Sequence, residues 1–183
     1  MLNTNYKLNL FHFEYDGTLP LQEFKYDSPR KVLGFIPDKI IPLVQKMIDL
    51  MDDFDDRSIV VDYRVRDLKK DMSGAMLPGY HLDCSKDIHC NFKPETHLIY
   101  TNIFGTKIAT NPIDESKYKD LPDLLNNNSI DELTLFDNHV HMYDSKMLHN
   151  APIVTYNCQR LLIRVTSGFN DRKLYNKANK HDK

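Results

Sequence analysis

The first third of the chain carries one clear helical pattern. Apolar residues recur every three or four positions between residues 40 and 51. The apolar positions of this stripe are Ile40, Val44, Met47, Ile48 and Met51. The pair Pro37-Asp38 precedes the stripe, so Asp38 is the predicted N-cap, and Pro42 falls in the first turn, where a missing N–H costs least. The pattern therefore predicts an amphipathic helix that packs on a sheet.

From residue 58 onward the pattern changes to short β-strands. Runs rich in β-branched and aromatic residues are separated by turn residues, and Phe104-Gly105 marks one such turn. The predicted strands are 58–65, 96–101, 106–110, 133–136, 139–143 and 159–166. Alternate residues of a strand point to opposite faces of its sheet. In the last and strongest strand, the prediction puts Leu161, Ile163 and Val165 on one face and Arg160, Leu162, Arg164 and Thr166 on the other.

Many short strands after a single helix favour two packed sheets over alternating βαβ units. We therefore predict a mainly β (α+β) fold with one or two flanking helices, of the double-stranded β-helix or jelly-roll type. The length of 183 residues suits a single domain with its own core. Within it we expect an N-terminal strand and helix region 1–57, a β core of about 58–168 and a polar C-terminal tail 169–183.

The composition narrows the function classes. A formal net charge of −2 produces no overall basic field, so the charge does not indicate nucleic acid as a partner. The three cysteines, Cys84, Cys90 and Cys158, lack the spacing of a disulfide framework or a zinc site, and we predict free thiols. No charged-then-apolar leader opens the sequence, and no apolar run of about 18 residues occurs in it. These features predict a cytoplasmic protein with no membrane partner.

The triplet His81-Leu82-Asp83 is the strongest indication of chemistry. It follows the turn signal Pro78-Gly79, and positions i and i+2 of a strand share a face, so His81 and Asp83 can meet at one ion. A third ligand must come from a distant strand. His149 lies 66 residues beyond Asp83, and Arg160 lies 11 residues further on. Two histidines and one carboxylate cap one face of a six-coordinate ion and leave three positions open, which is typical of non-haem Fe(II) oxygenases.

In these segments the chain resembles the Fe(II)- and 2-oxoglutarate-dependent dioxygenases of the double-stranded β-helix fold. The resemblance covers about residues 58–168 and depends on the segments 78–83, 149–152 and 160–164. It implies that His81, Asp83 and His149 are the catalytic ligands of Fe(II). It also implies that Arg160 pairs with the far carboxylate of the co-substrate 2-oxoglutarate, with Arg164 completing the pocket and Tyr100 supplying a hydroxyl.

The resemblance implies dioxygen as the other co-substrate and an oxidised primary substrate, for which a protein side chain, a nucleobase and a small metabolite all remain candidates. Two other functions also remain open. His139-Val140-His141 is a second i, i+2 histidine pair and would suit a cupin-type metalloenzyme, with Asp144 in place of the usual glutamate. A non-catalytic jelly-roll module that binds a protein or a sugar is the other. His97 is interpreted as an ordinary histidine, because it lies only 14 residues past Asp83.

Overall fold

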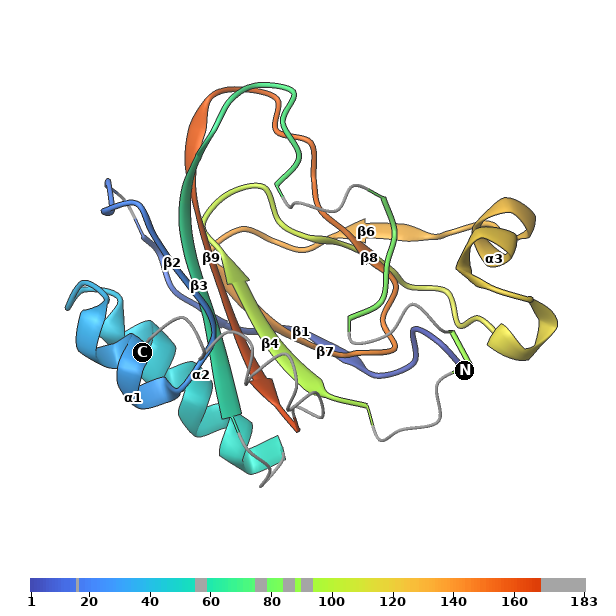
Figure 1. Cartoon of the computed structure of the whole chain (residues 1–183), viewed down its shortest axis with the longest axis horizontal. Helices are drawn as coiled ribbons and strands as arrows, with labels where there is room; N and C mark the ends of the chain where they lie inside the picture. The colour runs from blue at the N-terminus through green and yellow to red at the C-terminus, as the bar shows by residue number, and fades with distance from the viewer. Residues whose placement is uncertain (16, 55–58, 75–78, 84–87, 90–93, 169–183) are drawn as a thin grey trace, which may run out of the picture.

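A computed structural model of the chain describes residues 1–15, 17–54, 59–74, 79–83, 88–89 and 94–168, and it consists mainly of antiparallel strands (Figure 1). The strands are β1 (Tyr6–His12), β2 (Gln22–Asp27), β3 (Ile59–Leu68), β4 (Thr96–Thr101), β5 (Lys107–Ala109), β6 (Glu132–Thr134), β7 (His139–Asp144), β8 (His149–Asn150) and β9 (Cys158–Ser167). The helices are α1 (Pro29–Phe35), α2 (Ile41–Phe54) and α3 (Leu121–Asn127), and Glu115–Lys117 form the single 3-10 turn η1.

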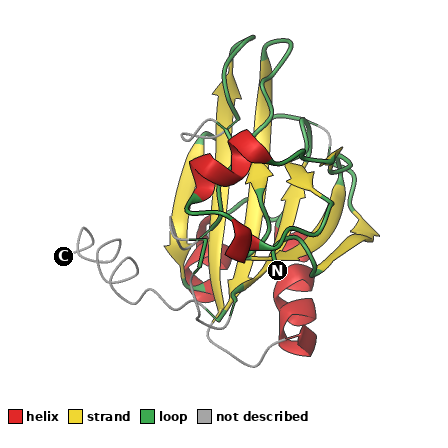
Figure 2. Cartoon of the chain, turned by 90° about the vertical axis from the view of Figure 1, so that its right-hand side faces the viewer, coloured by secondary structure: helices red, strands yellow, loops and turns green. Residues whose placement is uncertain are grey.

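The strands form two antiparallel sheets. The larger sheet has six strands in the order β1-β7-β4-β9-β3-β2, and the smaller has three in the order β6-β5-β8. Helices α1 and α2 cover one face of the larger sheet, the smaller sheet lies on its other side, and α3 is at the opposite end of the molecule from α1 and α2 (Figures 1 and 2). The larger sheet is therefore covered on both faces, and the polar groups of its inner face must find partners within the protein.

The predicted helix is confirmed, with a correction at its start. All five residues of the apolar stripe are buried in the main core, together with the sheet face formed by β3, β4, β7 and β9. Helix α2 begins at Ile41, however, and not after an N-cap at Asp38. The main-chain N–H groups of Ile40 and Ile41 bond to the carbonyl oxygens of Pro37 and Asp38, so residues 37–41 form a separate turn before the helix. Helix α1, which the apolar pattern did not predict, is capped by the Ser28 hydroxyl, which accepts a hydrogen bond from the N–H of Lys31.

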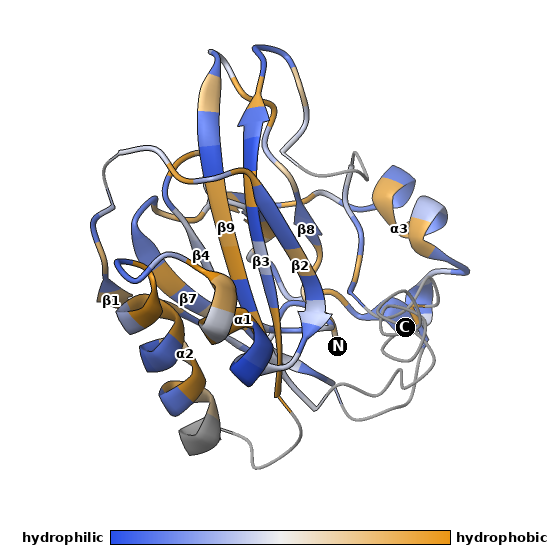
Figure 3. Ribbon diagram, turned by 60° about the vertical axis from the view of Figure 1, so that its left-hand side comes forward, coloured by the Kyte–Doolittle hydropathy of each residue, from blue (hydrophilic) through white to orange (hydrophobic). Residues whose placement is uncertain are grey.

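The six predicted strands are confirmed as β3, β4, β5, β6, β7 and β9. The two faces of β9 are also as predicted. Leu161, Ile163 and Val165 pack in the main core under the helices, and the residues between them point to the other side, where Arg160 and Arg164 line a cavity. In Figure 3, β9 lies at the centre of the sheet with α1 and α2 in front of it. The strongest strand of the sequence is thus the one that separates the apolar core from the polar cavity.

The N-terminal region is part of the same sheet as the β core. Strands β1 and β2 are its two outermost strands, paired with β7 and β3. Cys158 is a free thiol, as predicted, while Cys84, Cys90 and the tail 169–183 lie outside the described residues. Among the described residues, no helix is both long enough and apolar enough to cross a membrane.

The predicted turn at Phe104-Gly105 contains a position that only glycine can occupy. A Cβ added to Gly105 would overlap the carbonyl oxygen of Leu135, the residue that follows β6 and whose N–H is bonded to the carbonyl oxygen of Thr106. We expect Gly105→Ala to lower the free energy of unfolding by about 3 kcal/mol through this overlap. Urea denaturation measures the change. The matched control is Gly34→Ala in α1, where nothing lies within 4 Å of the added methyl group and a stabilisation of about 0.5–1 kcal/mol is expected. Equal stability changes for the two variants would contradict the prediction.

Candidate metal and co-substrate site

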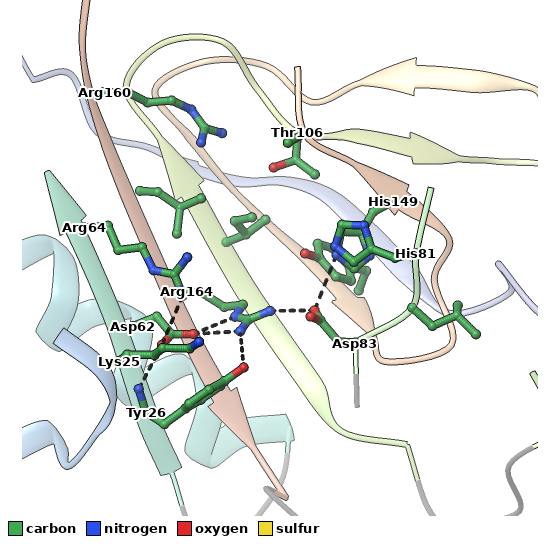
Figure 4. Close-up of a pocket in the computed structure, with 15 residues that line it drawn as sticks. Lys25, Tyr26, Asp62, Arg64, His81, Asp83, Thr106, His149, Arg160 and Arg164 are labelled. Carbon is green, nitrogen blue, oxygen red and sulfur yellow. Dashed lines mark hydrogen bonds and ion pairs between the residues drawn. The ribbon is translucent and has the colours of Figure 1, made fainter. Parts of the chain in front are cut away.

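A cavity of about 460 Å³ lies on the side of the larger sheet opposite the helices (Figure 4). Its lining comes from β2, β3, β4, β7 and β9, from the segment 81–83 and from residues near β8. Of the residues that the sequence singled out, it contains the proposed metal ligands His81, Asp83 and His149 together with Arg160 and Arg164. The fold thus brings five of the six predicted site residues to one place.

His81 and His149 lie next to each other because their main chains pair. Each donates its N–H to the carbonyl oxygen of the other, at 3.0 Å and 3.1 Å, and their ring centroids are 4.3 Å apart. In each ring, Nδ1 lies 3.0 Å from the carbonyl oxygen two residues earlier in the chain, that of Gly79 or Met147. A carbonyl oxygen can only accept, so these contacts assign the ring proton to Nδ1 and leave the Nε2 lone pair of each histidine available to an ion. This is the arrangement by which metal-binding histidines are usually oriented.

Asp83 lies beside His149, and its charge is balanced by Arg164. Its Oδ2 is 3.6 Å from His149 Nε2 and 2.6 Å from Arg164 Nη1. Burial alone would raise the pKa of Asp83, but the positive charge of Arg164, with smaller contributions from His149 and His97, holds that pKa well below its usual range. The carboxylate is therefore ionised at neutral pH.

His97 is part of this site, which the sequence did not predict. It is 1% exposed, its Nδ1 lies 2.9 Å from the Thr166 hydroxyl, and its Nε2 is 3.6 Å from Asp83 Oδ2. That Nε2 makes no hydrogen bond within the described part of the chain. Burial lowers the pKa of His97 to about 3, so the ring is neutral at neutral pH. The pairing of β4 with β9, which puts His97 opposite Thr166, is what brings it here.

Arg164 joins two buried carboxylates. Its guanidinium donates to Asp62 Oδ2 from Nη2 at 2.7 Å and from Nε at 3.0 Å, and to Asp83 Oδ2 at 2.6 Å (Figure 4). Asp62 is 1% exposed and lies opposite Arg164 in the pairing of β3 with β9. The position of Arg164 in the cavity wall agrees with its predicted part in the pocket. Its positive charge, however, is already paired with the carboxylates of Asp62 and Asp83.

Replacing Arg164 with methionine would leave two carboxylates in the cavity wall without their cation. We expect this variant to lower the free energy of unfolding by about 3–5 kcal/mol, because a buried charge that loses its partner keeps its desolvation cost. Urea denaturation at neutral pH measures the loss. Arg30→Met, on the exposed side of α1, is the matched control and should change stability by less than about 0.5 kcal/mol. If the Arg164 variant loses less than about 1 kcal/mol of its free energy of unfolding, the ion pairs of Arg164 with Asp62 and Asp83 contribute little to stability.

Arg160 is a buried cation without a carboxylate. It is 4% exposed, and its Nε and Nη1 donate to the main-chain oxygens of Ile103, Phe104 and Gly74 at 3.1–3.2 Å. In the described ranges no carboxylate oxygen lies within 4.0 Å of it, and its Nη2 has no hydrogen-bond partner there. Burial lowers the pKa of Arg160 to about 10, so it remains charged at neutral pH. Its position in the cavity wall is suited to an incoming anion.

Tyr100 does not belong to the cavity, so its predicted place there is wrong. Its hydroxyl donates to Phe13 O and Asn138 Oδ1, and its ring packs in the core under the helices. The neighbouring residue Ile99 lines the cavity, because alternate residues of β4 point to opposite sides. Hydroxyl groups that do line the cavity belong to Tyr26, Thr106 and Tyr143, and Thr106 lies between Arg160 and His149 in Figure 4.

The second histidine pair, on β7, is not arranged for an ion. Both ring nitrogens of His141 contact the main chain, Nδ1 accepting from Asn9 N–H at 3.3 Å and Nε2 lying 3.1 Å from Phe136 O. His139 Nδ1 lies 2.9 Å from Asp137 O, and the two ring centroids are 6.3 Å apart. Because His141 has no free lone pair, the geometry disfavours the cupin-type alternative.

In the part of the chain that the structure describes, no three His, Cys, Asp or Glu side chains are already placed to hold a metal ion.

No protein-family model matches the sequence, and no curated protein matches it. Among solved structures, the one titled "Crystal Structure of EvdMO1" is similar, with 11% identity over 87% of this chain and a TM-score of 0.45. This chain spans 38% of the length of that one. A likeness of this size establishes no shared function.

Proposed function

We propose that this protein is an Fe(II)- and 2-oxoglutarate-dependent oxygenase that hydroxylates a primary substrate. The observation that carries the proposal is the pairing of His81 and His149, each with Nδ1 bonded to a main-chain carbonyl group and Nε2 left free, beside the ionised carboxylate of Asp83. The same cavity contains Arg160, a buried guanidinium without a carboxylate. A metal-binding face and a carboxylate-binding cation in one cavity are the two parts that such an enzyme needs.

The order of the strands supports a double-stranded β-helix as the finer description of the fold. Along the chain, β3, β4, β7 and β9 belong to the larger sheet and lie next to one another in it. The intervening β5, β6 and β8 belong to the smaller sheet, and His81 adds a further strand position by its bridge to His149 of β8. The chain therefore passes back and forth between two facing sheets, which is the defining feature of double-sheet jelly rolls.

The residues of the site fit an iron ion after one exchange of partners. Two atoms bound to one ion at about 2.1 Å lie about 3.0 Å apart when adjacent and about 4.2 Å apart when opposite. Ligands on one face are adjacent, so the 3.6 Å between Asp83 Oδ2 and His149 Nε2 would need to shorten by about 0.6 Å for both atoms to bind one ion. Asp83 would exchange its contact with Arg164 for the ion, while Arg164 would keep its two hydrogen bonds to Asp62. The carboxylate would then remain paired with a positive charge throughout.

The chain itself supplies binding, orientation and exclusion of water. The Nη2 group of Arg160 would donate to the far carboxylate of 2-oxoglutarate, while Nε and Nη1 keep the guanidinium in place through their bonds to main-chain oxygens. Thr106 is placed to donate a further hydrogen bond. Tyr143, whose ring is 5.4 Å from that of His149, closes the buried side of the site. When bound, Fe(II) and 2-oxoglutarate supply the oxidative chemistry with dioxygen.

Anaerobic titration of the purified protein with Fe(II) and then with 2-oxoglutarate tests the proposal. The expected result is a weak visible charge-transfer band that saturates with both additions, because it requires the keto acid to chelate an iron ion held by the protein. No band, together with no effect of Fe(II) on thermal unfolding, would reject the oxygenase and favour the non-catalytic binding module.

A further inference from the structure

Two cations lie at the end of the cavity away from the paired histidines. They are Arg64 of β3 and Lys25 of β2, which both line the cavity; in the pairing of the two strands Arg64 lies opposite Glu23. In Figure 4 both lie on the far side of Arg164 from His81 and His149. Neither residue is needed for the metal or for the co-substrate in the function proposed above, so their presence in the cavity wall requires another explanation.

The side chain of Arg64 makes two long ion pairs and, among the described residues, no hydrogen bond. Its Nε is buried and lacks a hydrogen-bond partner among the described residues. Its nearest carboxylate oxygens belong to Glu23, 3.5 Å from Nε, and to Asp62, 3.8 Å from Nη2. Both carboxylates make shorter contacts with other guanidinium groups, Glu23 with Arg66 at 2.8 Å and Asp62 with Arg164 at 2.7 Å. A buried charged donor that lacks an acceptor is costly, so an oxygen-rich ligand beside Arg64 would be favoured.

Lys25 adds a second positive charge to this end of the cavity. Its Nζ lies 5.5 Å from the centre of the Tyr26 ring, and within the described ranges it has no carboxylate oxygen within 4.0 Å. The side chain is exposed at the cavity mouth. It is therefore free to turn toward a ligand that Arg64 has bound.

We propose that this end of the cavity binds a phosphate ester group of the primary substrate, with Arg64 and Lys25 as its cationic contacts. The inference rests on the proposed function in taking the phosphate to be part of the substrate that is oxidised. A phosphate monoester carries close to two negative charges, and it would meet two cations that make no hydrogen bond to a carboxylate among the described residues. The Nε edge of a guanidinium donates in plane to phosphate oxygens, and an ammonium group binds them as a point charge. A cavity of about 460 Å³ is within the size range that holds a drug-sized ligand, so it has room beyond the co-substrate.

A chain of ion pairs separates the phosphate end from the metal end. Arg64 contacts Asp62 at 3.8 Å, Asp62 contacts Arg164 at 2.7 Å, and Arg164 contacts Asp83 at 2.6 Å. The recognised phosphate and the oxidised carbon would therefore lie on different parts of the substrate. Phosphate binding would fix the distance of the reacting carbon from the ion, which is the positioning role that remote binding groups have in catalysis.

The test is a titration of the metal-free protein with inorganic phosphate, followed through the arginine Nε–H signals in ¹⁵N-correlated NMR spectra. The titration is made in wild type and in Arg160→Gln, which removes the other cation available to an anion. We expect a saturable shift of the Arg64 Nε–H signal in both proteins. Arg64→Gln and Lys25→Gln should each weaken phosphate binding by at least about tenfold by calorimetry. Arg30→Gln on α1 has the same change of charge and should leave the affinity unchanged.

A shift that grows without saturation, or equal weakening by Arg30→Gln, would overturn the proposal, since phosphate would then act only as a diffuse counter-ion. Because the titration needs neither iron nor 2-oxoglutarate, its outcome is separate from that of the proposed function. Saturable phosphate binding without a charge-transfer band would support the phosphate site and reject the oxygenase. A band with an unmoved Arg64 signal would support the oxygenase and reject the phosphate site.

Discussion

The His149→Ala variant is expected to lose the charge-transfer band of the Fe(II)–2-oxoglutarate chelate. His149 contributes a free Nε2 that lies 3.6 Å from Asp83 Oδ2, and its ring centroid lies 4.3 Å from that of His81. Alanine removes one of three ligands and the ring that orients a second, so we expect iron affinity to fall at least about 100-fold. Anaerobic titration with Fe(II), at saturating 2-oxoglutarate, measures the change.

The control for this variant is His139→Ala. His139 is also a strand histidine, but its Nδ1 lies 2.9 Å from the carbonyl oxygen of Asp137 and it lies away from the cavity. The control should bind Fe(II) like wild type. A band that survives in the His149 variant and disappears in the His139 variant would move the metal to β7 and restore the cupin-type alternative.

The second large effect is expected at Arg160. Among the described residues, Arg160 is the cavity charge that is buried and also has no carboxylate oxygen within 4.0 Å. Replacing it with glutamine removes this charge. We expect the 2-oxoglutarate concentration at half-maximal band intensity to rise at least about 100-fold, the loss typical of a buried charge pair. Iron affinity without co-substrate, measured by calorimetry, should change by less than about threefold.

Arg160→Lys separates charge from geometry at this position. Lysine keeps the positive charge but lacks the planar fork, so an intermediate loss of 2-oxoglutarate affinity is expected. Arg30→Gln on α1 controls for the change in net charge. Unchanged 2-oxoglutarate affinity in both Arg160 variants would contradict its assignment to the co-substrate, and a parallel loss of iron affinity would indicate damage to the fold instead.

Local sequence patterns were sufficient for the elements of the core. The apolar stripe of α2 and the alternation of apolar residues in β9 are both periodic. The side of each element that is buried can therefore be predicted from the sequence of that segment alone. The two faces of β9 were therefore assigned correctly, with Leu161, Ile163 and Val165 in the core and Arg160 and Arg164 in the cavity. Helix α1 is too short, at 7 residues, for such a periodicity to be visible.

For strand β4, the sequence pattern is not sufficient to assign the two faces. All its residues after Thr96 are buried, because the sheet is covered on both faces, so no alternation of polar and apolar residues distinguishes its two sides. The family resemblance implies Tyr100 in the cavity, the short spacing from Asp83 argues against His97, and the pattern of β4 corrects neither prediction. Only the register with β9, which sets His97 opposite Thr166 and Ile99 opposite Arg164, decides which side chains reach Asp83.

The sequence by itself determined the β-rich fold, the helix on its outer face, and the candidates His81, Asp83, His149 and Arg160, because periodicity and residue chemistry are local properties. The tertiary structure alone decided that the two histidines pair through their main chains and that Arg164 bridges Asp62 and Asp83. Such contacts join residues that are up to 102 positions apart. They depend on which strands become neighbours and in which register, and the packing of the whole domain sets both.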